Sequence, residues 1–590
     1  MDSYTLTIAI SVLAFIVVGN YAGRRVHTVE DYFVAGRRAP TLLILGTLVA
    51  SVFSTSLFLG EAGFTYDGQM GPYLLLPGIA VTGYIYGALF FGTFLRRSRA
   101  PTVADYFGHR FNSRRVQQAA GVTIVFGLGG YLLVVTQGAA LLLADLTALN
   151  YVEAVLVAWL SYTIFTLYAG SRGVIITDTL MFLLFTVATV LFVAKLVGGF
   201  GGVATAVEAL ASQGSKPDIA AWHGTIGAGT PWPRAVDFLI WFIIIDLSWS
   251  VVYAVSPWQA SRHLMARDEH VVLRASIYAC FAVIVMQYLI YGAGGLVNLA
   301  RTDIAPSETV LLWAARHLVP GFLGALLLAG IVAAALSSAS TFLSLVGFSV
   351  SNDLGSRDRA PRLATTRLLM GGVAIVVLAL SLTVPANVFW IMLFIGTVFA
   401  SSWGPVAFMS VWSSRITAAG AFWGLVAGFA GNVVPAALDY AGLIRLPSYL
   451  NPALLGAVIS VAAIYLASSR AGPSAREQSF RQRLHMTPAG DRNRRKTLLT
   501  LVAPALLVVY GALMPALLLH WYVLPYQRGR GIVGADGAID WSQAEPWFAL
   551  GPALLFVPLG LIAAAVIWRR YSPGATTATL QPEEESVTSW

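Results

Sequence analysis

Runs of about 20 mostly apolar residues recur along nearly the whole chain, and they limit its fold more than any other feature. A transmembrane helix needs about 20 such residues to cross roughly 30 Å of hydrocarbon. The sequence therefore predicts an all-α integral membrane protein with about fifteen transmembrane helices. The predicted spans are residues 3–22, 41–64, 73–95, 116–145, 152–170, 173–197, 236–256, 271–299, 320–350, 367–384, 388–412, 416–437, 452–469, 497–521 and 547–568.

The composition excludes a soluble globular domain and offers no catalytic motif. Hydrophobic residues make up 57% of the 590 residues and charged residues only 11%, whereas about a quarter of a soluble domain is charged. The single cysteine, Cys280, lies within an apolar span, so neither an intramolecular disulfide nor a cysteine metal site can form. The chain has no H-E-x-x-H, G-x-S-x-G or P-loop sequence, and we expect no enzymatic activity.

The basic residues gather in alternate loops, which accounts for the net charge of +9 without a nucleic-acid partner. Such loops mark the cytoplasmic side of a membrane protein. We therefore predict a multi-pass protein of the plasma or inner membrane, with its N-terminus outside and its C-terminus in the cytoplasm. The basic loops carry Arg24, Arg25, Arg37 and Arg38, then Arg96, Arg97 and Arg99, then Arg262 and Arg267, then Arg357, Arg359 and Arg362, and finally residues 470–496.

Composition shifts along the chain predict a main body and an appended helix pair, separated by a basic linker. We expect no intramembrane charge in the appended pair, so its role is packing against the body or against a partner protein. The predicted units are 1–40 (first helix and cytoplasmic loop), 41–197 (spans two to six), 198–235 (external loop), 236–412 (spans seven to eleven), 413–469 (spans twelve and thirteen), 470–496 (basic linker), 497–568 (appended pair) and 569–590 (polar cytoplasmic tail).

The segment from Gly330 to Thr341 places two adjacent hydroxyls, Ser337 and Ser338, inside a long apolar helix. The carbonyl of Ala334 lies on the same helical face as Ser337. Hydroxyls and freed carbonyls are the oxygen ligands that a hard monovalent cation needs. The alternative is that small residues merely allow helices to pack closely, with the hydroxyls bonded to the preceding turn.

Five stretches of the chain occur in the order found in one transporter family. They are the segment around Ser337 and Ser338, Asp31 to Arg37, Thr177-Asp178 after a turn at Ala169-Gly170, Tyr253 to Pro257 with Ser261 to Ala266, and Trp403 to Val406 with Trp412 and Gly420. Together they resemble the sodium:solute symporter family, which includes Na+/proline and Na+/sugar cotransporters. The resemblance covers about residues 1–470.

The resemblance implies a LeuT-type core of two inverted five-helix repeats, spans two to six and seven to eleven, each opening with a discontinuous helix. No glycine or proline interrupts the second span between Thr47 and Leu59, so that break is implied by the family alone. Asp178 matches the acidic residue on the family's ion path, with a helix-capping role as its alternative. The family's sodium ligands would here be the carbonyls of Ala50, Phe53 and Ala334 and the hydroxyls of Ser337 and Ser338.

The seventh span repeats Trp249, Tyr253 and Pro257 at intervals of four, along one helical stripe. Such stripes often only pack or anchor a helix at the interface, but the matching positions line the substrate site of Na+/proline symporters. Ser54 and Ser56, on the facing helix, would complete the pocket. Val52 and Met181 replace polar residues of the proline transporters, and Ser56 replaces a large aromatic. These departures leave proline itself, and sodium rather than a proton as the coupling ion, in doubt.

Asp246, Glu61 and Asp67 are acidic residues in or beside apolar spans that these motifs do not include. Asp246 lies in the apolar sequence from Trp241 to Trp249 and needs a partner there. It could meet a substrate ammonium, carry a proton, or accept a structural hydrogen bond from a neighbouring helix. Glu61 and Asp67 flank the external end of the second span, where we expect solvated side chains.

The sequence thus predicts a secondary transporter that couples Na+ to a small organic solute, with an amino acid or a monocarboxylate favoured. A proton-coupled symporter of the same fold and a transporter-like solute sensor are the alternatives. Its partners would be the solute, the lipid bilayer and a protein bound at the basic linker or the appended pair.

Overall fold

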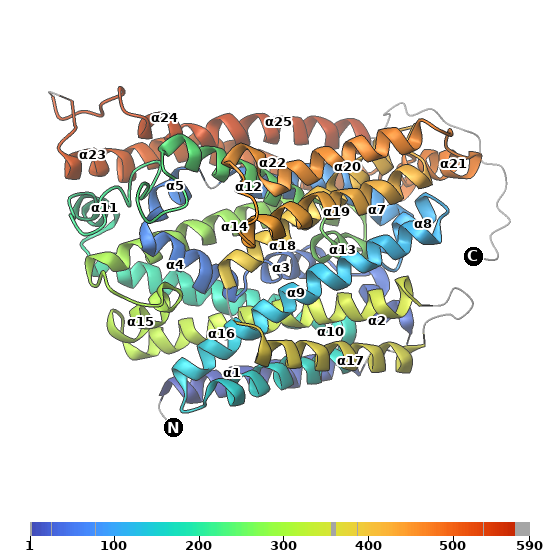
Figure 1. Cartoon of the computed structure of the whole chain (residues 1–590), viewed down its shortest axis with the longest axis horizontal. Coiled ribbons are helices and arrows are strands. Elements are labelled where there is room, and N and C mark those ends of the chain that lie inside the picture. The colour runs from blue at the N-terminus through green and yellow to red at the C-terminus, as the bar shows by residue number, and fades with distance from the viewer. Residues whose placement is uncertain are drawn as a thin grey trace.

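The computed structural model describes residues 3–24, 26, 28–76, 78–355, 362–385, 388–534 and 536–572, and the regular structure in these residues is helical (Figure 1). Long apolar segments favour helices in a membrane because a helix satisfies its own backbone groups. The long helices are α1 (Ser3–Gly23), α9 (Arg114–Leu146), α10 (Tyr151–Gly199), α12 (Ala235–Val255), α14 (Glu269–Leu296), α16 (Gly321–Phe348), α17 (Leu363–Thr383), α18 (Val388–Trp412), α19 (Ala418–Tyr440), α22 (Arg494–Leu518) and α25 (Gly551–Tyr571).

Thirteen stretches of the described chain are long and apolar enough to cross a membrane. The two other predicted spans contain shorter helices. The second span breaks after α3 (Thr41–Ala50), and the thirteenth forms α20 (Pro452–Ser468), which has 17 residues. The all-helical prediction is therefore confirmed, whereas the count of fifteen spans is not.

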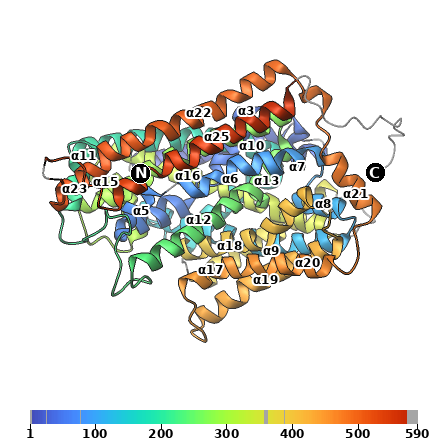
Figure 2. The same ribbon diagram turned by 90° about the horizontal axis from the view of Figure 1, so that it is seen from above.

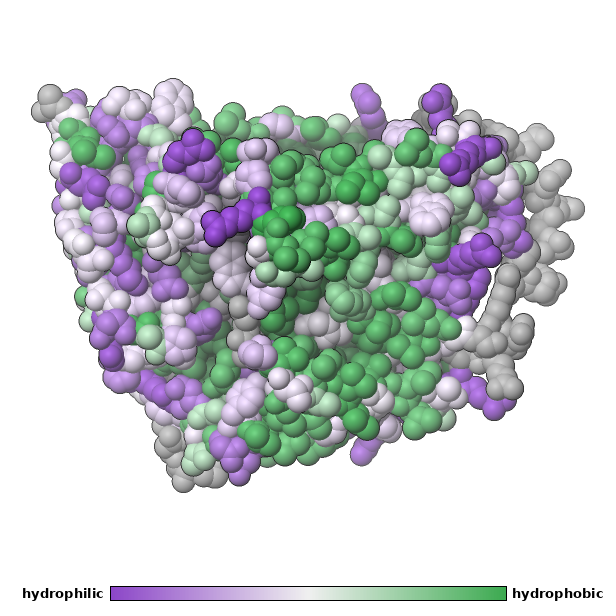
Figure 3. Space-filling model, in the orientation of Figure 1, coloured by the Kyte–Doolittle hydropathy of each residue, from purple (hydrophilic) through white to green (hydrophobic). Residues whose placement is uncertain are grey.

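One face of the bundle has an apolar middle and polar ends. Figure 3 shows hydrophobic residues across the centre of one face and hydrophilic residues at both ends. Large exposed apolar side chains, such as Leu13, Leu368 and Leu466, contribute to this surface. An apolar belt between polar ends is the surface that a bilayer requires of a membrane protein.

The predicted basic loops meet at one end of the bundle. Arg37 donates to the carbonyl oxygen of Arg99 (2.6 Å), Arg96 donates to that of Ala266 (2.5 Å), and Ala39 pairs with Ala266 in an isolated bridge. The helix α1 begins at the opposite end, and α25 ends at the basic end (Figure 1). Of the basic residues predicted in these loops, Arg25, Arg357 and Arg359 lie outside the described residues.

Two helices are discontinuous, and their breaks lie side by side. The first break separates α3 from the short helical segment η2 (Ser56–Glu61), and the Ser54 hydroxyl there accepts a bond from the backbone N–H of Ser56 (3.1 Å). The second break separates α12 from α13 (Pro257–Met265), because proline lacks an N–H and forces the residue before it into an extended conformation. The Gln259 amide donates to the Ser51 hydroxyl (3.2 Å), which joins the two breaks.

The helix α10 contains the fifth and sixth predicted spans. They meet at Gly170, whose φ of 53° and ψ of −157° interrupt the helical backbone. A Cβ at this position would also overlap the ring of Tyr32. The turn predicted between the two spans is therefore a kink that only glycine adopts easily.

The appended helices α22 and α25 pack together along one side of the bundle, with α19 and α20 on the opposite side (Figure 2). The Thr497 hydroxyl at the start of α22 donates to the carbonyl oxygen of Tyr571 at the end of α25 (3.2 Å), so the pair is antiparallel. The basic linker contains α21 (Ala475–Leu484) and returns to the main body. Of the predicted polar tail, residues 573–590 lie outside the described residues.

Candidate functional site

The helix α16 lies against the first break and brings a hydroxyl to its carbonyls. The Ser338 hydroxyl oxygen is 3.4 Å from the Ala50 carbonyl oxygen and 3.3 Å from that of Phe53. All three residues are buried. Ala334, also buried, lies one helical turn before Ser338 and hence on the same face of α16. Three of the predicted cation ligands are therefore neighbours, and the fourth lies on the helical face that meets them.

The second predicted hydroxyl belongs to an adjoining polar network. Ser337 donates to one carboxylate oxygen of Asp178 (2.7 Å), and Thr47 of α3 donates to the other (2.6 Å). Asp178 is fully buried in α10. The Ser337 oxygen keeps its lone pairs when its hydrogen is donated, so it remains able to ligate a cation.

A buried arginine balances the charge of Asp178. The Arg262 guanidinium of α13 is 3.6 Å from the Asp178 carboxylate and donates to the Thr341 hydroxyl (2.6 Å). Arg262 is only 2% exposed, and a buried carboxylate needs such a partner. The network therefore links both discontinuous helices to α10 and α16.

This arrangement has the chemistry of a monovalent cation site. Its ligands are neutral hydroxyl and carbonyl oxygens, which suit a hard cation, and freed carbonyls at a helix break are the usual source of such oxygens in transporters. The nearby Asp178 and Arg262 cancel each other in charge, so one bound cation adds a single positive charge to a neutral surrounding.

Four of the five predicted substrate residues lie in the buried region next to the breaks. The Trp249 and Tyr253 rings contact each other with centroids 5.7 Å apart, and Tyr253 stacks on Tyr84 of α6 (Gly78–Gly87) at 4.9 Å. Ser54 and Ser56 are buried beside the phenol group of Tyr131. Trp249 and Tyr253 thus form an aromatic group on α12, and Ser54 and Ser56 supply buried hydroxyls at the first break.

The Trp249 indole lies in a space that a glycine provides. A Cβ on Gly396 of α18 would come within 2.7 Å of the indole ring. The indole Nε1 is buried and has no hydrogen-bond partner among the described residues. A buried donor without a partner costs free energy, which a solute with an acceptor atom would recover.

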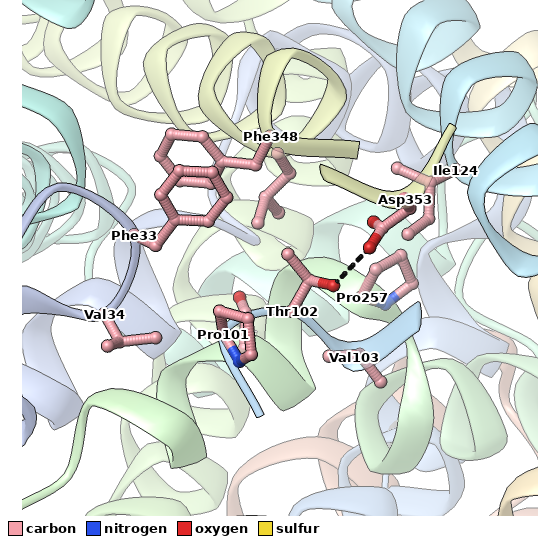
Figure 4. Close-up of a pocket in the computed structure, with 11 residues that line it drawn as sticks. Phe33, Val34, Pro101, Thr102, Val103, Ile124, Pro257, Phe348 and Asp353 are labelled. Atoms are coloured by element: carbon pink, nitrogen blue, oxygen red, sulfur yellow. Dashed lines mark hydrogen bonds between the residues drawn. The ribbon is translucent and has the colours of Figure 1, made fainter. Parts of the chain in front are cut away.

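Pro257 does not continue the predicted stripe, because α12 ends at Val255 and the chain turns at Ser256. Pro257 instead lines a small cavity toward the basic end, with Phe33, Thr102 and Asp353 (Figure 4). Thr102 donates to the Asp353 carboxylate there (2.7 Å), as the dashed line in Figure 4 shows. The substrate role of Pro257 remains a prediction, but Pro257 and Tyr253 do not share one helical face.

Asp246 and Glu61 are both half-buried and face the same region. Asp246 lies beside the backbone N–H of Ala80, in the first turn of α6. Its role remains a prediction. Glu61 accepts a hydrogen bond from the Tyr291 hydroxyl of α14. The expectation that Glu61 is simply a solvated mouth residue is therefore wrong.

Comparison with known proteins decides the family. The model of the sodium:solute symporter family matches residues 32–428. The chain belongs to this family. The match contains both discontinuous helices and α16, and it ends before the basic linker and the appended pair.

Relatives of this symporter include transporters of different solutes. The sodium/pantothenate symporter of Escherichia coli (strain K12) is 24% identical over 64% of this chain and 78% of that protein. The sodium/proline symporter of Salmonella typhimurium (strain LT2) is 23% identical over 72% of this chain and 86% of that protein. Both of these relatives are sodium-coupled symporters.

A solved structure shows the same fold. A Na+-coupled sialic acid symporter in a substrate-bound outward-open state superposes with a TM-score of 0.67 at 18% identity, over 81% of this chain and 99% of that one. The symporter therefore has the LeuT-type core of two five-helix repeats. The broken helices α3–η2 and α12–α13 lie in the second and seventh spans, which are the spans predicted to open the two repeats.

Three residues at the core of this symporter were not predicted as site residues. Arg262 was assigned to a basic loop, although it pairs with Asp178 inside the bundle. Gln259 joins the two breaks, and Glu61 binds Tyr291. The sequence signal for the first two is their place directly after Pro257, in the segment that follows a broken helix.

Proposed function

We propose that this symporter couples the entry of Na+ to the uptake of a small organic solute, with an amino acid or a monocarboxylate as the favoured class. The observation that carries this proposal is the approach of the Ser338 hydroxyl to the carbonyl oxygens of Ala50 and Phe53. It supplies neutral oxygen ligands at a helix break, next to the aromatic side chains expected to bind solute.

The charge balance favours Na+ over a proton as the coupling ion. A proton carrier needs an ionisable group that is free to change its charge, whereas Asp178 is held by Arg262, Thr47 and Ser337. The hydroxyl and carbonyl oxygens beside it bind a metal cation without changing their own charge.

Cation and solute would be coupled through the first break. The cation ligands Ala50 and Phe53 precede Ser54 and Ser56, the hydroxyls assigned to the solute, by only a few residues. A cation that fixes the backbone of this break therefore fixes the solute pocket at the same time. Alternating access then requires that α3 and α16 separate toward the basic end and release the cation past Asp178.

The pocket supports a solute with a carboxylate. The Trp249 indole N–H has no acceptor among the residues that the structure describes. The segment η2 begins at Ser56, where the positive end of a helix dipole favours an anionic group. A carboxylate is common to amino acids and monocarboxylates. The aromatic wall of Trp249 and Tyr253 suits an apolar body of small size.

We further propose that the protein lies in the cell membrane with its basic loops in the cytoplasm. Because these loops meet at one end of the bundle, that end would face the cytoplasm, with the start of α1 outside. A cytoplasmic partner at the basic linker would have to bind the exposed side of α21, since the other side packs on the main body.

Uptake into proteoliposomes tests the proposed function. An inward Na+ gradient should drive accumulation of a solute from a panel that includes proline and pantothenate, and an equal K+ gradient should not. The double variant Ser337→Ala/Ser338→Ala should lose the Na+ dependence while its expression is unchanged. Accumulation driven by a pH gradient, without any effect of Na+, would contradict sodium coupling.

A further inference from the structure

The two carboxylates Glu61 and Asp246 lie on the same side of the breaks in the two discontinuous helices. Glu61 is the last residue of η2, beyond the first break, and Asp246 lies in α12, before the second break. The helix α12 runs toward its break from the end opposite the basic loops. Both carboxylates are therefore on the side of the breaks away from the basic loops, where the pocket would receive solute from outside.

Aromatic side chains enclose Glu61. The Tyr291 hydroxyl donates to its carboxylate, and the Tyr291 ring packs edge-on against the Tyr73 ring, with centroids 4.7 Å apart. Tyr73 in turn packs against Phe242, one helical turn before Asp246 (5.4 Å). An aromatic wall thus runs from one carboxylate to the other.

The carboxylates of Glu61 and Asp246 are close enough to interact electrostatically, and Asp246 also interacts with Tyr73 and Tyr253. Both side chains are half-buried. Among the described residues, no lysine, arginine or histidine forms an ion pair with either of them. Two neighbouring carboxylates inside a membrane protein, with no basic side chain beside them, are stabilised either by a bound proton or by a cation, and a cationic ligand would serve as the second.

A buried acceptor lies on α14, the helix that also carries Tyr291. Gln287 of α14 is only 5% exposed, and its side-chain oxygen has no hydrogen-bond partner among the described residues. Gln287 lies one turn from Tyr291 on the helical face that meets η2 and the following segment, since Gly294 on this face lies against Ala62. A ligand with N–H donors would satisfy this oxygen.

The surroundings favour an organic ammonium group over a metal ion. Aromatic faces attract ammonium groups and add to the carboxylate attraction when water is excluded. A hard metal ion instead needs several oxygen ligands around it, and the wall between Glu61 and Asp246 consists of tyrosine and phenylalanine rings.

We propose that Glu61 and Asp246 bind the ammonium group of the transported solute, in a site enclosed by Tyr73, Tyr253 and Tyr291. The solute is then an amino acid or another carboxylate-bearing amine rather than a simple monocarboxylate. This inference rests on the proposed solute symport and narrows its substrate class.

Matched ligands test the inference on the purified full-length protein in NaCl. L-Alanine and L-proline are compared with propionate and cyclopentanecarboxylate, which lack the ammonium group, within a wider panel of amino acids and amines. A bound ligand raises the melting temperature. Amine-bearing members should raise it, and their deaminated counterparts should not.

Variants then locate the site. Glu61→Gln and Asp246→Asn should each weaken binding of the amine by about 10- to 100-fold, as expected for loss of a charged hydrogen bond. Asp67→Asn is the control, because Asp67 lies nearby but is bonded to Ser307 (2.7 Å) outside the site. If Glu61→Gln does not fold, Asp246→Asn and Tyr291→Phe, which removes only the hydroxyl on Glu61, decide the question.

Three results would overturn the inference. They are the absence of a shift with any amine-bearing compound, equal binding of an amine by wild type and both carboxylate variants, and a change in Na+ affinity instead of amine affinity. Na+-dependent uptake of an ammonium-free solute such as pantothenate, unchanged in Glu61→Gln, would refute the ammonium site while leaving sodium symport intact.

Discussion

The substitution Ser338→Ala tests the cation site with the smallest change in shape. It removes one hydroxyl oxygen that lies 3.4 Å from the Ala50 carbonyl oxygen and 3.3 Å from that of Phe53. Bonds of this length are weak, so the free energy of folding without Na+ should change little. The main loss is one of five proposed oxygen ligands.

The expected change in Na+ affinity follows from the free energy of one buried polar contact. Leaving a buried group without its partner costs about 1 to 3 kcal/mol, which corresponds to a rise of roughly 5- to 150-fold in the Na+ concentration for half-saturation. The melting temperature of the purified protein is measured against NaCl at constant ionic strength with KCl. Stabilisation grows with the logarithm of one plus the ratio of Na+ concentration to Kd, so a fit of this dependence gives the concentration for half-saturation.

Ser340→Ala is the matched control. Ser340 is a buried serine of the same helix, and its hydroxyl donates only to the carbonyl oxygen of Ser337 in that helix (2.9 Å). Its Na+ titration should match that of the wild type. An unchanged half-saturation in Ser338→Ala, or an equal change in both variants, would refute the assignment of Ser338 as a ligand.

Two further predictions concern regions outside the cation site. Glu269→Gln breaks a buried ion pair with Arg97 (2.5 and 2.7 Å) and a hydrogen bond from Tyr571 of the appended helices. It should therefore cost about 3 to 5 kcal/mol of stability and expose the linker 470–496 to protease, and Tyr571→Phe should have a smaller effect. Equal protease resistance of Glu269→Gln and wild type would contradict this docking of the appended helices. Burial raises the pKa of Asp105 in α8 (Val103–Arg110) in the folded protein. In the unfolded chain the pKa of this side chain is about 4, so above pH 4 the ionisation of Asp105 lowers the stability of the folded state. Asp105→Asn should therefore melt higher than wild type at pH 7, with the gain shrinking toward pH 4; a gain that is constant with pH would contradict the role of ionisation.

The sequence predicts much of the fold because transmembrane helices require long apolar runs, and such runs are visible in the sequence. The break at Pro257 has a local cause that a reader of the sequence can find. The break between Ala50 and Ser56 has none, since it contains neither glycine nor proline and is held by contacts such as that between Ser51 and Gln259. Only the family resemblance anticipates it.

The site is less predictable, because its polar groups find partners far away in the sequence. Ser337 and Ser338 stand out as hydroxyls in an apolar helix, but the pairing of Asp178 with Arg262 depends on how α10 packs against α13. Glu61 reads as a mouth residue, since nothing near it in the sequence indicates Tyr291. The stripe through Pro257 fails for a related reason: helical periodicity does not hold across a break.

Equilibrium binding of radiolabelled Na+ to the purified protein, without any solute, tests sodium coupling most directly. The account predicts saturable binding that K+ does not displace, that Ser337→Ala/Ser338→Ala abolishes and that Ser340→Ala retains. The absence of saturable Na+ binding to the folded wild-type protein, or its persistence in the double variant, would contradict a cation site between the broken helix and α16.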